Sequence, residues 1–374
     1  MNCSGIDVFT GRPLRIDYGE TIRRVSYEET GGAIPFVSPG FIDIQVNGFD
    51  GVDFNDPSIS MDEIARALDA MLATGVTRCL PTVITGAPDV MLACLGNLRR
   101  AQMQLPRRRV IAGFHVEGPH IGAEDGPRGA HPARWVRPPD LDEYRRWQDA
   151  TGGNIRLITL SPHWPEAPRY IAAITRDGVV ASIGHTGASA DQIAAAVDAG
   201  ATLSTHLGNG AHAVMRRHPN YIWDQLADDR LSASFIVDGI HLGRNFLRAA
   251  LRAKGIERSI LVTDAAGPAG AKPGRYRLGE QDVDLTPDDR VVLVGTEKLA
   301  GSALKMNRGV ARLVRLAGLD LPAAVTMATV NPARLLGLPA PSFSAGSPAD
   351  LVLFRNDGLD IDAVYLAGER IVGS

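Results

Sequence analysis

Short apolar segments recur along the middle of the chain, with stretches of helical periodicity between most of them. Apolar and polar residues do not alternate cleanly in these segments, VVASI at 179–183 being one example. This pattern is typical of strands in a parallel sheet that is covered by helices. Strands are predicted at about 41–46, 76–80, 110–116, 155–160, 179–184, 201–205, 232–237 and 259–263. Eight strand–helix units of this kind predict an α/β fold, a (β/α)8 TIM barrel.

The helices between the strands have recognisable boundaries. Ser60 and Glu63 have the spacing of a capping box, and Gly75 can end the helix that follows them. One apolar face of this helix is formed by Ile64, Leu68, Met71 and Leu72. Ser189 and Gln192 repeat the capping pattern before IAAAVDAG. Both segments therefore predict helices that pack against the barrel.

The two ends of the chain have a different pattern. Residues 1–37 and 348–374 contain short β-like pieces with Gly and Pro between them, so they are expected to form one small β-sandwich domain. Residues 38–347 would then form the barrel. Two further β-like runs predict a hairpin inserted near 274–297, after the eighth strand.

Composition excludes several classes of protein. Of 374 residues, 45% are hydrophobic and 22% are charged, which is close to the globular average. The net charge of -3 argues against nucleic-acid binding. No 18 apolar residues run together, and the N-terminus lacks the pattern of a signal peptide, so neither a membrane protein nor a secreted one is expected. Three cysteines without CxxC spacing fit a reducing compartment, and we predict a cytoplasmic protein.

A residue suited to metal binding or proton transfer follows four of the predicted strands. These residues are Glu117, His185, His206 and Asp264. The carboxyl ends of barrel strands meet at one face, so we expect the four side chains to converge there. One carboxylate and two imidazoles form a set that zinc accepts, with an open position for water. Asp264 would take a proton from that water and return one to a leaving nitrogen, which predicts metal-assisted amide hydrolysis.

Each of these residues also has a purely structural interpretation when it is considered alone. A buried His can cap a helix, and Asp264 can be a polar cap after an apolar strand. The occurrence of all four at strand ends favours the metal-dependent hydrolase.

Seven segments carry a resemblance to a known family. They are PGFIDIQVNG (39–48), HVEGPHI (115–121), GHTGAS (184–189), STHLGNG (204–210), DGIHL (238–242), LVTDAAGPAG (261–270) and LAGSALKM (299–306). With these segments in this order, the chain resembles the N-acetylglucosamine-6-phosphate deacetylases of the amidohydrolase superfamily. The resemblance spans nearly the whole sequence. It implies hydrolysis of N-acetylglucosamine 6-phosphate to glucosamine 6-phosphate and acetate, in amino-sugar catabolism.

The resemblance also implies a metal site. One divalent ion, Zn²⁺ or alternatively Fe²⁺ or another divalent ion, would be bound by Glu117, His185 and His206, with Asp264 as the acid and base. Many amidohydrolases bind a second metal through an HxH pair after the first strand. This chain has Gln45-Val46-Asn47 there, so a single metal is expected.

Substrate contacts follow from the same resemblance. They are expected from Asn209, Gly210, His241 and His131, and a phosphate contact is expected from Arg217. In this family that arginine reaches into the neighbouring subunit's site, which implies a homodimer. Segments 208–220 and 122–131 differ from the usual family forms, and this leaves the choice of substrate open.

Two other functions remain open on the sequence. One is a related amidohydrolase that acts on another N-acyl amino sugar, such as N-acetylgalactosamine 6-phosphate. The other is a non-catalytic sugar-phosphate binding protein, but a protein of this kind has no need of a proton shuttle at Asp264.

Overall fold

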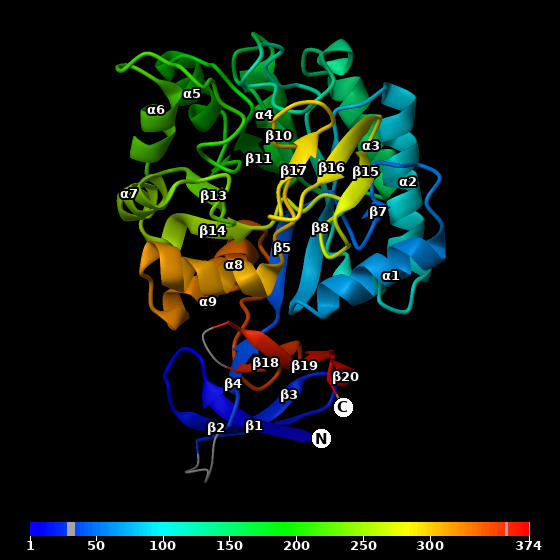
Figure 1. Cartoon of the computed structure of the whole chain (residues 1–374), viewed down its shortest axis with the longest axis vertical. Helices are drawn as coiled ribbons and strands as arrows, with labels where there is room; N and C mark the ends of the chain where they lie inside the picture. The colour runs from blue at the N-terminus through cyan, green and yellow to red at the C-terminus, as the bar shows by residue number, and fades with distance from the viewer. Residues whose placement is uncertain (28–33, 356–357, 374) are drawn as a thin grey trace.

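A closed barrel of eight parallel strands forms the centre of the molecule (Figure 1). The structure is a computed structural model and describes residues 1–27, 34–355 and 358–373. The strands are β5 (Phe41–Val46), β8 (Val76–Ile84), β9 (Phe114–Glu117), β10 (Ile155–Leu160), β11 (Val180–Ile183), β12 (Leu203–Ser204), β13 (Ser232–Ile236) and β14 (Ser259–Val262). They lie in sequence order, and a parallel bridge between Val46 and Ala265 closes the barrel. The predicted fold class is confirmed.

Two strands are shorter than the apolar pattern predicted. The third begins at Phe114, because residues Arg108–Val110 form a 3-10 helix, η1, and Gly113 has a φ of 155°. The sixth is limited to Leu203–Ser204, since the chain turns at His206, which has a φ of 29°. Apolar composition alone does not reveal where the backbone leaves the sheet.

A helix follows each barrel strand and covers the outside of the sheet. These helices are α1 (Met61–Leu72), α2 (Pro88–Gln104), α3 (Leu141–Thr151), α4 (Ala167–Arg176), α5 (Ala190–Asp198), α6 (Tyr221–Ala227), α7 (Arg244–Lys254) and α8 (Met306–Arg312). The remaining helical segments are η2 (Ala133–Trp135), η3 (Ile256–Arg258), the π-helix η4 (Leu313–Ala317), α9 (Leu321–Ala328) and α10 (Val330–Leu335). Both predicted capping boxes are present, at Ser60 and Ser189.

The two ends of the chain meet in one antiparallel-rich sheet below the barrel (Figure 1). Its strands are β1 (Asn2–Asp7), β2 (Pro13–Tyr18), β3 (Ile22–Ser26), β4 (Phe36–Pro39), β18 (Leu351–Arg355), β19 (Asp360–Leu366) and β20 (Glu369–Val372). The sheet curls so that the Ile22 N–H donates to the carbonyl of Ser347, and the rings of Tyr18 and Tyr365 meet 5.4 Å apart across its apolar interior. The domain boundaries at 37/38 and 347/348 stay a prediction.

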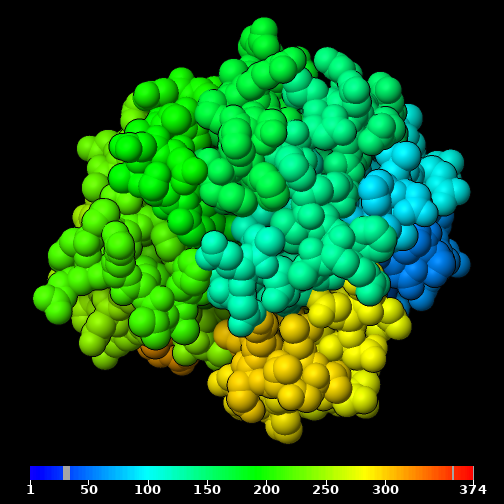
Figure 2. Space-filling model, turned by 90° about the horizontal axis from the view of Figure 1, so that it is seen from above, coloured from blue at the N-terminus to red at the C-terminus, as the bar shows by residue number. Residues whose placement is uncertain are grey.

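An insertion after β14 lies over the carboxyl ends of the barrel strands (Figure 1). It is a three-stranded antiparallel sheet of β15 (Gly274–Leu278), β16 (Gln281–Leu285) and β17 (Val291–Leu293), where the sequence predicted a hairpin. A small ribbon, β6 (Gly48–Phe49) with β7 (Val52–Asp53), lies after β5. Seen from above, the insertion contacts the segment near residue 130 at the mouth of the barrel (Figure 2). The Lys298 ammonium lies 2.5 Å from the Asp125 carboxylate, and Arg134 pairs with Glu280 at 2.6 Å.

None of the helices in the described part of the chain is long and apolar enough to cross a membrane. Cys3, Cys79 and Cys94 are buried free thiols.

Candidate active site

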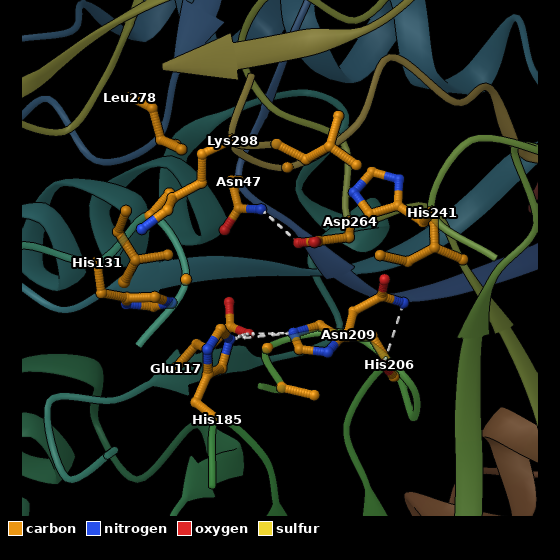
Figure 3. Close-up of a pocket in the computed structure, with 18 of the residues that line it drawn as sticks. Asn47, Glu117, His131, His185, His206, Asn209, His241, Asp264, Leu278 and Lys298 are labelled. Carbon is orange, nitrogen blue, oxygen red and sulfur yellow. Dashed lines mark hydrogen bonds and ion pairs between the residues drawn. The ribbon is translucent and has the colours of Figure 1, made fainter. Parts of the chain in front are cut away.

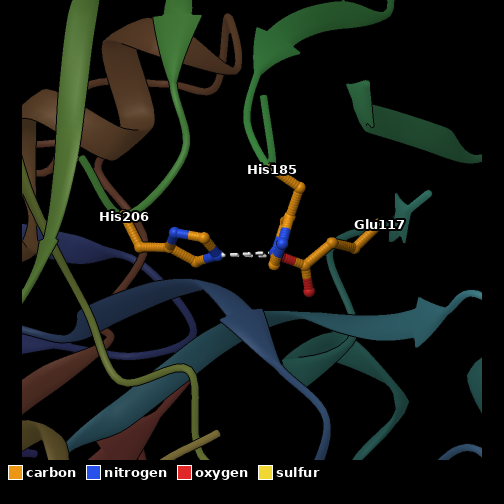
Figure 4. Close-up of side chains that lie close together, drawn as sticks. All are labelled: Glu117, His185 and His206. Carbon is orange, nitrogen blue, oxygen red and sulfur yellow. Dashed lines mark hydrogen bonds and ion pairs between the residues drawn. The ribbon is translucent and has the colours of Figure 1, made fainter. Parts of the chain in front are cut away.

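Three side chains from three barrel strands converge at the mouth of the barrel (Figure 4). Glu117 ends β9, and His185 and His206 follow β11 and β12. Glu117 Oε1 lies 3.1 Å from His185 Nε2 and 3.0 Å from His206 Nε2, and the two Nε2 atoms are 3.1 Å apart. All three side chains are buried. A tetrahedral zinc ion with bonds of about 2.0–2.1 Å places its ligand atoms roughly 3.3 Å apart, so this set fits such an ion.

Hydrogen bonds hold the His185 ring and the backbone of His206 in place. The His185 ring contacts the Pro127 carbonyl through Nδ1 at 2.8 Å, which makes Nδ1 the protonated nitrogen and leaves the Nε2 lone pair for a metal. The backbone N–H of His206 donates to Ser234 Oγ at 2.7 Å. Glu117 has a pKa well below its usual range: burial opposes this shift, but the two histidines outweigh burial.

Asp264 lies beside this cluster and is held by two amides. Asn47 Nδ2 donates to Asp264 Oδ1 at 2.8 Å, and Gln45 Nε2 donates to the same oxygen at 3.2 Å. Gln45 Nε2 also donates to Glu117 Oε1 at 2.8 Å, so it joins the two carboxylates. Burial, together with the charge of Glu117, raises the pKa of Asp264 to about 6. A cation bound at the neighbouring ligands would oppose this rise.

Three of these residues have backbone conformations that residues with a Cβ rarely adopt. The φ angles are 51° at His185, 29° at His206 and 49° at Asp264. Each such conformation is unfavourable by about 1–3 kcal/mol, and strain of this kind is characteristic of functional sites. All three residues lie just after a barrel strand, and their side chains line the same cavity.

A cavity of about 250 Å³ opens above the cluster (Figure 3). Of the residues predicted from the sequence, its walls include Glu117, His131, His185, His206, Asn209, Gly210, His241 and Asp264. The walls also include residues that the sequence did not identify, among them Ile84, Leu278 and Lys298. Leu278 ends β15 of the insertion and Lys298 follows β17, so their approach to the barrel depends on tertiary packing and leaves no signal in the sequence pattern.

The two further histidines of the cavity have defined partners. His131 Nδ1 lies 2.8 Å from Thr85 Oγ1. Burial and the nearby His185 lower the pKa of His131 to about 3, so this ring is neutral at physiological pH. His241 Nδ1 lies 2.6 Å from Asp238 Oδ2. Each ring thus has one nitrogen engaged away from the cavity and can use Nε2 toward a ligand.

Arg217 does not line the cavity. It is exposed on the segment before α6, where its carbonyl accepts a hydrogen bond from Asn220 Nδ2 at 3.1 Å. Nearby, Val214 is 89% exposed and Trp223 is 53% exposed. Asp125 and Arg128, in the segment 122–131, pair with each other at 3.3 Å and do not line the cavity.

Gly210 has a packing role that leads to a testable prediction. Its φ is 55°, and a Cβ added there would lie 2.7 Å from His185 Nδ1. Gly210→Ala is therefore expected to displace the His185 ring from Pro127 and to weaken metal binding by about 10-fold or more. Metal affinity is measured by competition with a chelator. Gly243→Ala is the matched control, since nothing lies within 4 Å of a Cβ there and φ is -64°. Unchanged affinity in Gly210→Ala would contradict the prediction.

Comparisons with known proteins agree with this geometry. The profile of the Amidohydrolase family matches residues 36–371. N-acetylglucosamine-6-phosphate deacetylase from Bos taurus is 35% identical over 364 residues, covering 93% of this chain and 86% of that protein. N-acetylgalactosamine-6-phosphate deacetylase from Shewanella sp. (strain ANA-3) is 34% identical over 340 residues, covering 89% and 82%.

A solved structure is similar over the full length. It is a mutant of N-acetyl-D-glucosamine-6-phosphate deacetylase from Mycobacterium smegmatis, in complex with N-acetyl-D-glucosamine-6-phosphate. Its TM-score is 0.92 at 34% sequence identity, with 100% of this chain and 99% of that chain covered. The likeness therefore includes both the barrel and the terminal sheet.

Proposed function

The chain belongs to the amidohydrolase family, and we propose that within this family it is a metal-dependent deacetylase of N-acetylglucosamine 6-phosphate. The products are glucosamine 6-phosphate and acetate, and the reaction belongs to amino-sugar catabolism. The observation that carries this proposal is the convergence of Glu117, His185 and His206 beside Asp264 in one cavity. The relatives with this activity, matched over most of the chain, support the same substrate.

Glu117, His185 and His206 are the proposed ligands of one divalent ion per subunit. We take the ion to be Zn²⁺, with Fe²⁺ as the alternative, because the donor set is two imidazoles and one carboxylate. When bound, such an ion supplies a water that ionises near neutral pH and polarises the acetyl carbonyl. Gln45 and Asn47 hold the position of the HxH pair and use their amide groups as donors to carboxylates. This supports a single ion.

Asp264 is the proposed acid and base. Both amide donors contact its Oδ1, so its Oδ2 is the oxygen that remains for proton transfer. Asp264 takes a proton from the water whose oxygen bonds to the acetyl carbon. It then gives the proton to the nitrogen as the C–N bond breaks and the electron pair goes to nitrogen. Neutral His131, with Nδ1 toward Thr85, donates from Nε2 to the acetyl oxygen.

The sugar and its phosphate are bound by further residues of the cavity wall and by one residue from outside it. Asn209, the backbone of Gly210 and His241 are the proposed contacts of this subunit. Arg217 contacts the phosphate in the neighbouring subunit of a homodimer. The exposed apolar side chains of Val214, Met215 and Trp223 around Arg217 support an interface there. We also assign the enzyme to the cytoplasm, which the three free thiols support.

The role of Arg217 leads to a prediction about substrate phosphate. Arg217→Ala is expected to raise the KM for N-acetylglucosamine 6-phosphate by about 10-fold or more, since a charge-assisted contact contributes about 1.5–3 kcal/mol. The KM for unphosphorylated N-acetylglucosamine should not change. Arg216→Ala, at the neighbouring exposed arginine, is the matched control. Mixed dimers with Asp264→Asn in one subunit and Arg217→Ala in the other should retain one complete site with the wild-type KM, and the raised KM of Arg217→Ala in these dimers would contradict contact across the interface.

The alternative substrate is N-acetylgalactosamine 6-phosphate, favoured by the relative from Shewanella and by the altered segment 208–220. The test is acetate release by the metal-loaded protein from N-acetylglucosamine 6-phosphate, its galactosamine epimer and unphosphorylated N-acetylglucosamine. Fast release from the first alone supports the proposal. Preference for the epimer selects the alternative. Release from none, with metal bound and the fold intact, overturns both.

A further inference from the structure

We infer that Asn47 contacts the substrate directly and that its Oδ1 accepts a hydrogen bond from the N–H of the acetamido group that is cleaved. This inference rests on the proposed function and deepens it. Asn47 would recognise the N–H of the substrate amide, next to Asp264, which transfers the proton.

The Asn47 side chain is fixed in place by its surroundings. It is 2% exposed and lies in the wall of the cavity (Figure 3). Its backbone N–H donates to the Ala265 carbonyl at 2.7 Å, and its carbonyl accepts from the Phe54 N–H at 2.9 Å. Its Nδ2 donates to Asp264 Oδ1 at 2.8 Å. An ionised carboxylate only accepts, so the amide is oriented with nitrogen toward Asp264 and oxygen away from it.

Asn47 Oδ1 is a buried acceptor without a partner. Among the described residues that line the cavity, two buried side-chain atoms lack a hydrogen-bond partner, Asn47 Oδ1 and His206 Nδ1. His206 Nδ1 carries the ring proton when Nε2 serves as a metal ligand, so it is a donor. An unsatisfied buried acceptor is unfavourable by about 1–3 kcal/mol. At a functional site, the bound substrate can supply the missing hydrogen-bond donor.

The substrate has one donor at the reacting amide. Its carbonyl oxygen and its phosphate oxygens accept hydrogen bonds, whereas the acetamido N–H donates. Asp264 must reach the same nitrogen to protonate it. Asn47 is hydrogen-bonded to Asp264 and lines the same cavity, so its side chain lies on the side of the cavity where this nitrogen must be. Gln45 differs from Asn47, because it contacts the carboxylates of Glu117 and Asp264 but does not line the cavity.

The contact has a consequence for bond cleavage. When the C–N bond breaks, its electron pair goes to nitrogen and the proton from Asp264 is added there, while the original N–H stays on the leaving amine. An acceptor that holds this N–H turns the nitrogen lone pair toward Asp264. The same acceptor disfavours acyl compounds that lack an N–H, because these leave Oδ1 unpaired.

Ligand binding tests the inference without turnover. The protein is metal-loaded Asp264→Asn, in which the amide oxygen of the substituted side chain can still accept the hydrogen bonds from Gln45 and Asn47. The two ligands are N-acetylglucosamine 6-phosphate and its 2-acetonyl isostere, in which a methylene replaces the N–H. Calorimetry should show the amide binding about 10-fold or more tightly than the isostere. Equal affinities in this protein would overturn the inference.

Two further variants in the same background assign the preference to one atom. Asn47→Leu removes Oδ1, so the amide and its isostere should bind this variant with about equal affinity. Gln45→Met is the matched control: it removes the other donor to residue 264 but keeps Oδ1, so the preference should persist. A preference that survives Asn47→Leu would show that another group receives the N–H. Failure of Asp264→Asn to bind either ligand would instead overturn the proposed function, and the inference with it.

Discussion

Asp264→Asn is expected to reduce kcat by about 100-fold to 10,000-fold, the range that a positioned acid or base contributes. The substitution keeps the size of the side chain in a site that is 8% exposed. It also keeps an oxygen that can accept the hydrogen bonds of Asn47 and Gln45. Only the capacity to take and return a proton is lost. The measurement is acetate release at saturating substrate, with metal content determined on the same sample.

The control for this variant is Asp238→Asn. Asp238 is also a buried carboxylate at a barrel strand end, but its partner is His241 and it does not line the cavity. We expect this change to act mainly on KM, through the orientation of His241. Near-normal turnover in Asp264→Asn, with a full complement of metal, would remove Asp264 from the proposed mechanism.

The barrel was predictable because its strands share a physical requirement. A parallel strand covered by helices is apolar on both faces, so each unit appears as a short apolar run followed by a capped helix. Ser60 and Ser189 marked two helix starts correctly, since their capping depends on residues three positions apart. The start of β9 was missed because Gly113 and η1 interrupt an apolar run without changing its hydrophobicity.

The cluster at the barrel mouth was predictable for a related reason. The ends of parallel strands meet in space, so Glu117, His185 and His206 could be expected to converge before any distance was known. The contacts around these three residues could not be predicted from the sequence. Pro127 contacts His185 through a backbone carbonyl, and Lys298, which follows the last strand of the insertion, is held by an ion pair with Asp125. Neither contact corresponds to a periodicity or a fixed residue spacing that could be recognised in the sequence.

The role of Asn47 was predictable only in part. Its position after β5 was visible in the sequence as a departure from the HxH pair, which indicated that a second metal is not held there. The structure adds that its amide donates to Asp264 and leaves an acceptor buried in the cavity. The sequence showed only that Asn47 replaces a metal-binding histidine, whereas the structure makes it a candidate for substrate recognition.

His206→Ala is expected to lower metal affinity by more than the roughly 10–100-fold that loss of an outer partner of a metal ligand produces. The variant removes one of three proposed ligand atoms, and Glu117 and His185 alone offer two. Turnover should fall in parallel, because the ion supplies the nucleophilic water. The fold should persist, since the hydrogen bond from residue 206 to Ser234 Oγ uses the backbone N–H, which alanine retains.

Metal content after dialysis against a chelator measures this effect directly, and thermal unfolding with and without added Zn²⁺ measures it independently. Wild-type protein should be stabilised by the ion to an extent that grows with its concentration, whereas His206→Ala should respond only at much higher concentrations. His163→Ala is the control, because His163 follows β10 near the same face but contacts Ser161 and lies outside the cluster. Full metal occupancy in His206→Ala, with His163→Ala unchanged, would place the ion at other residues and require a different mechanism.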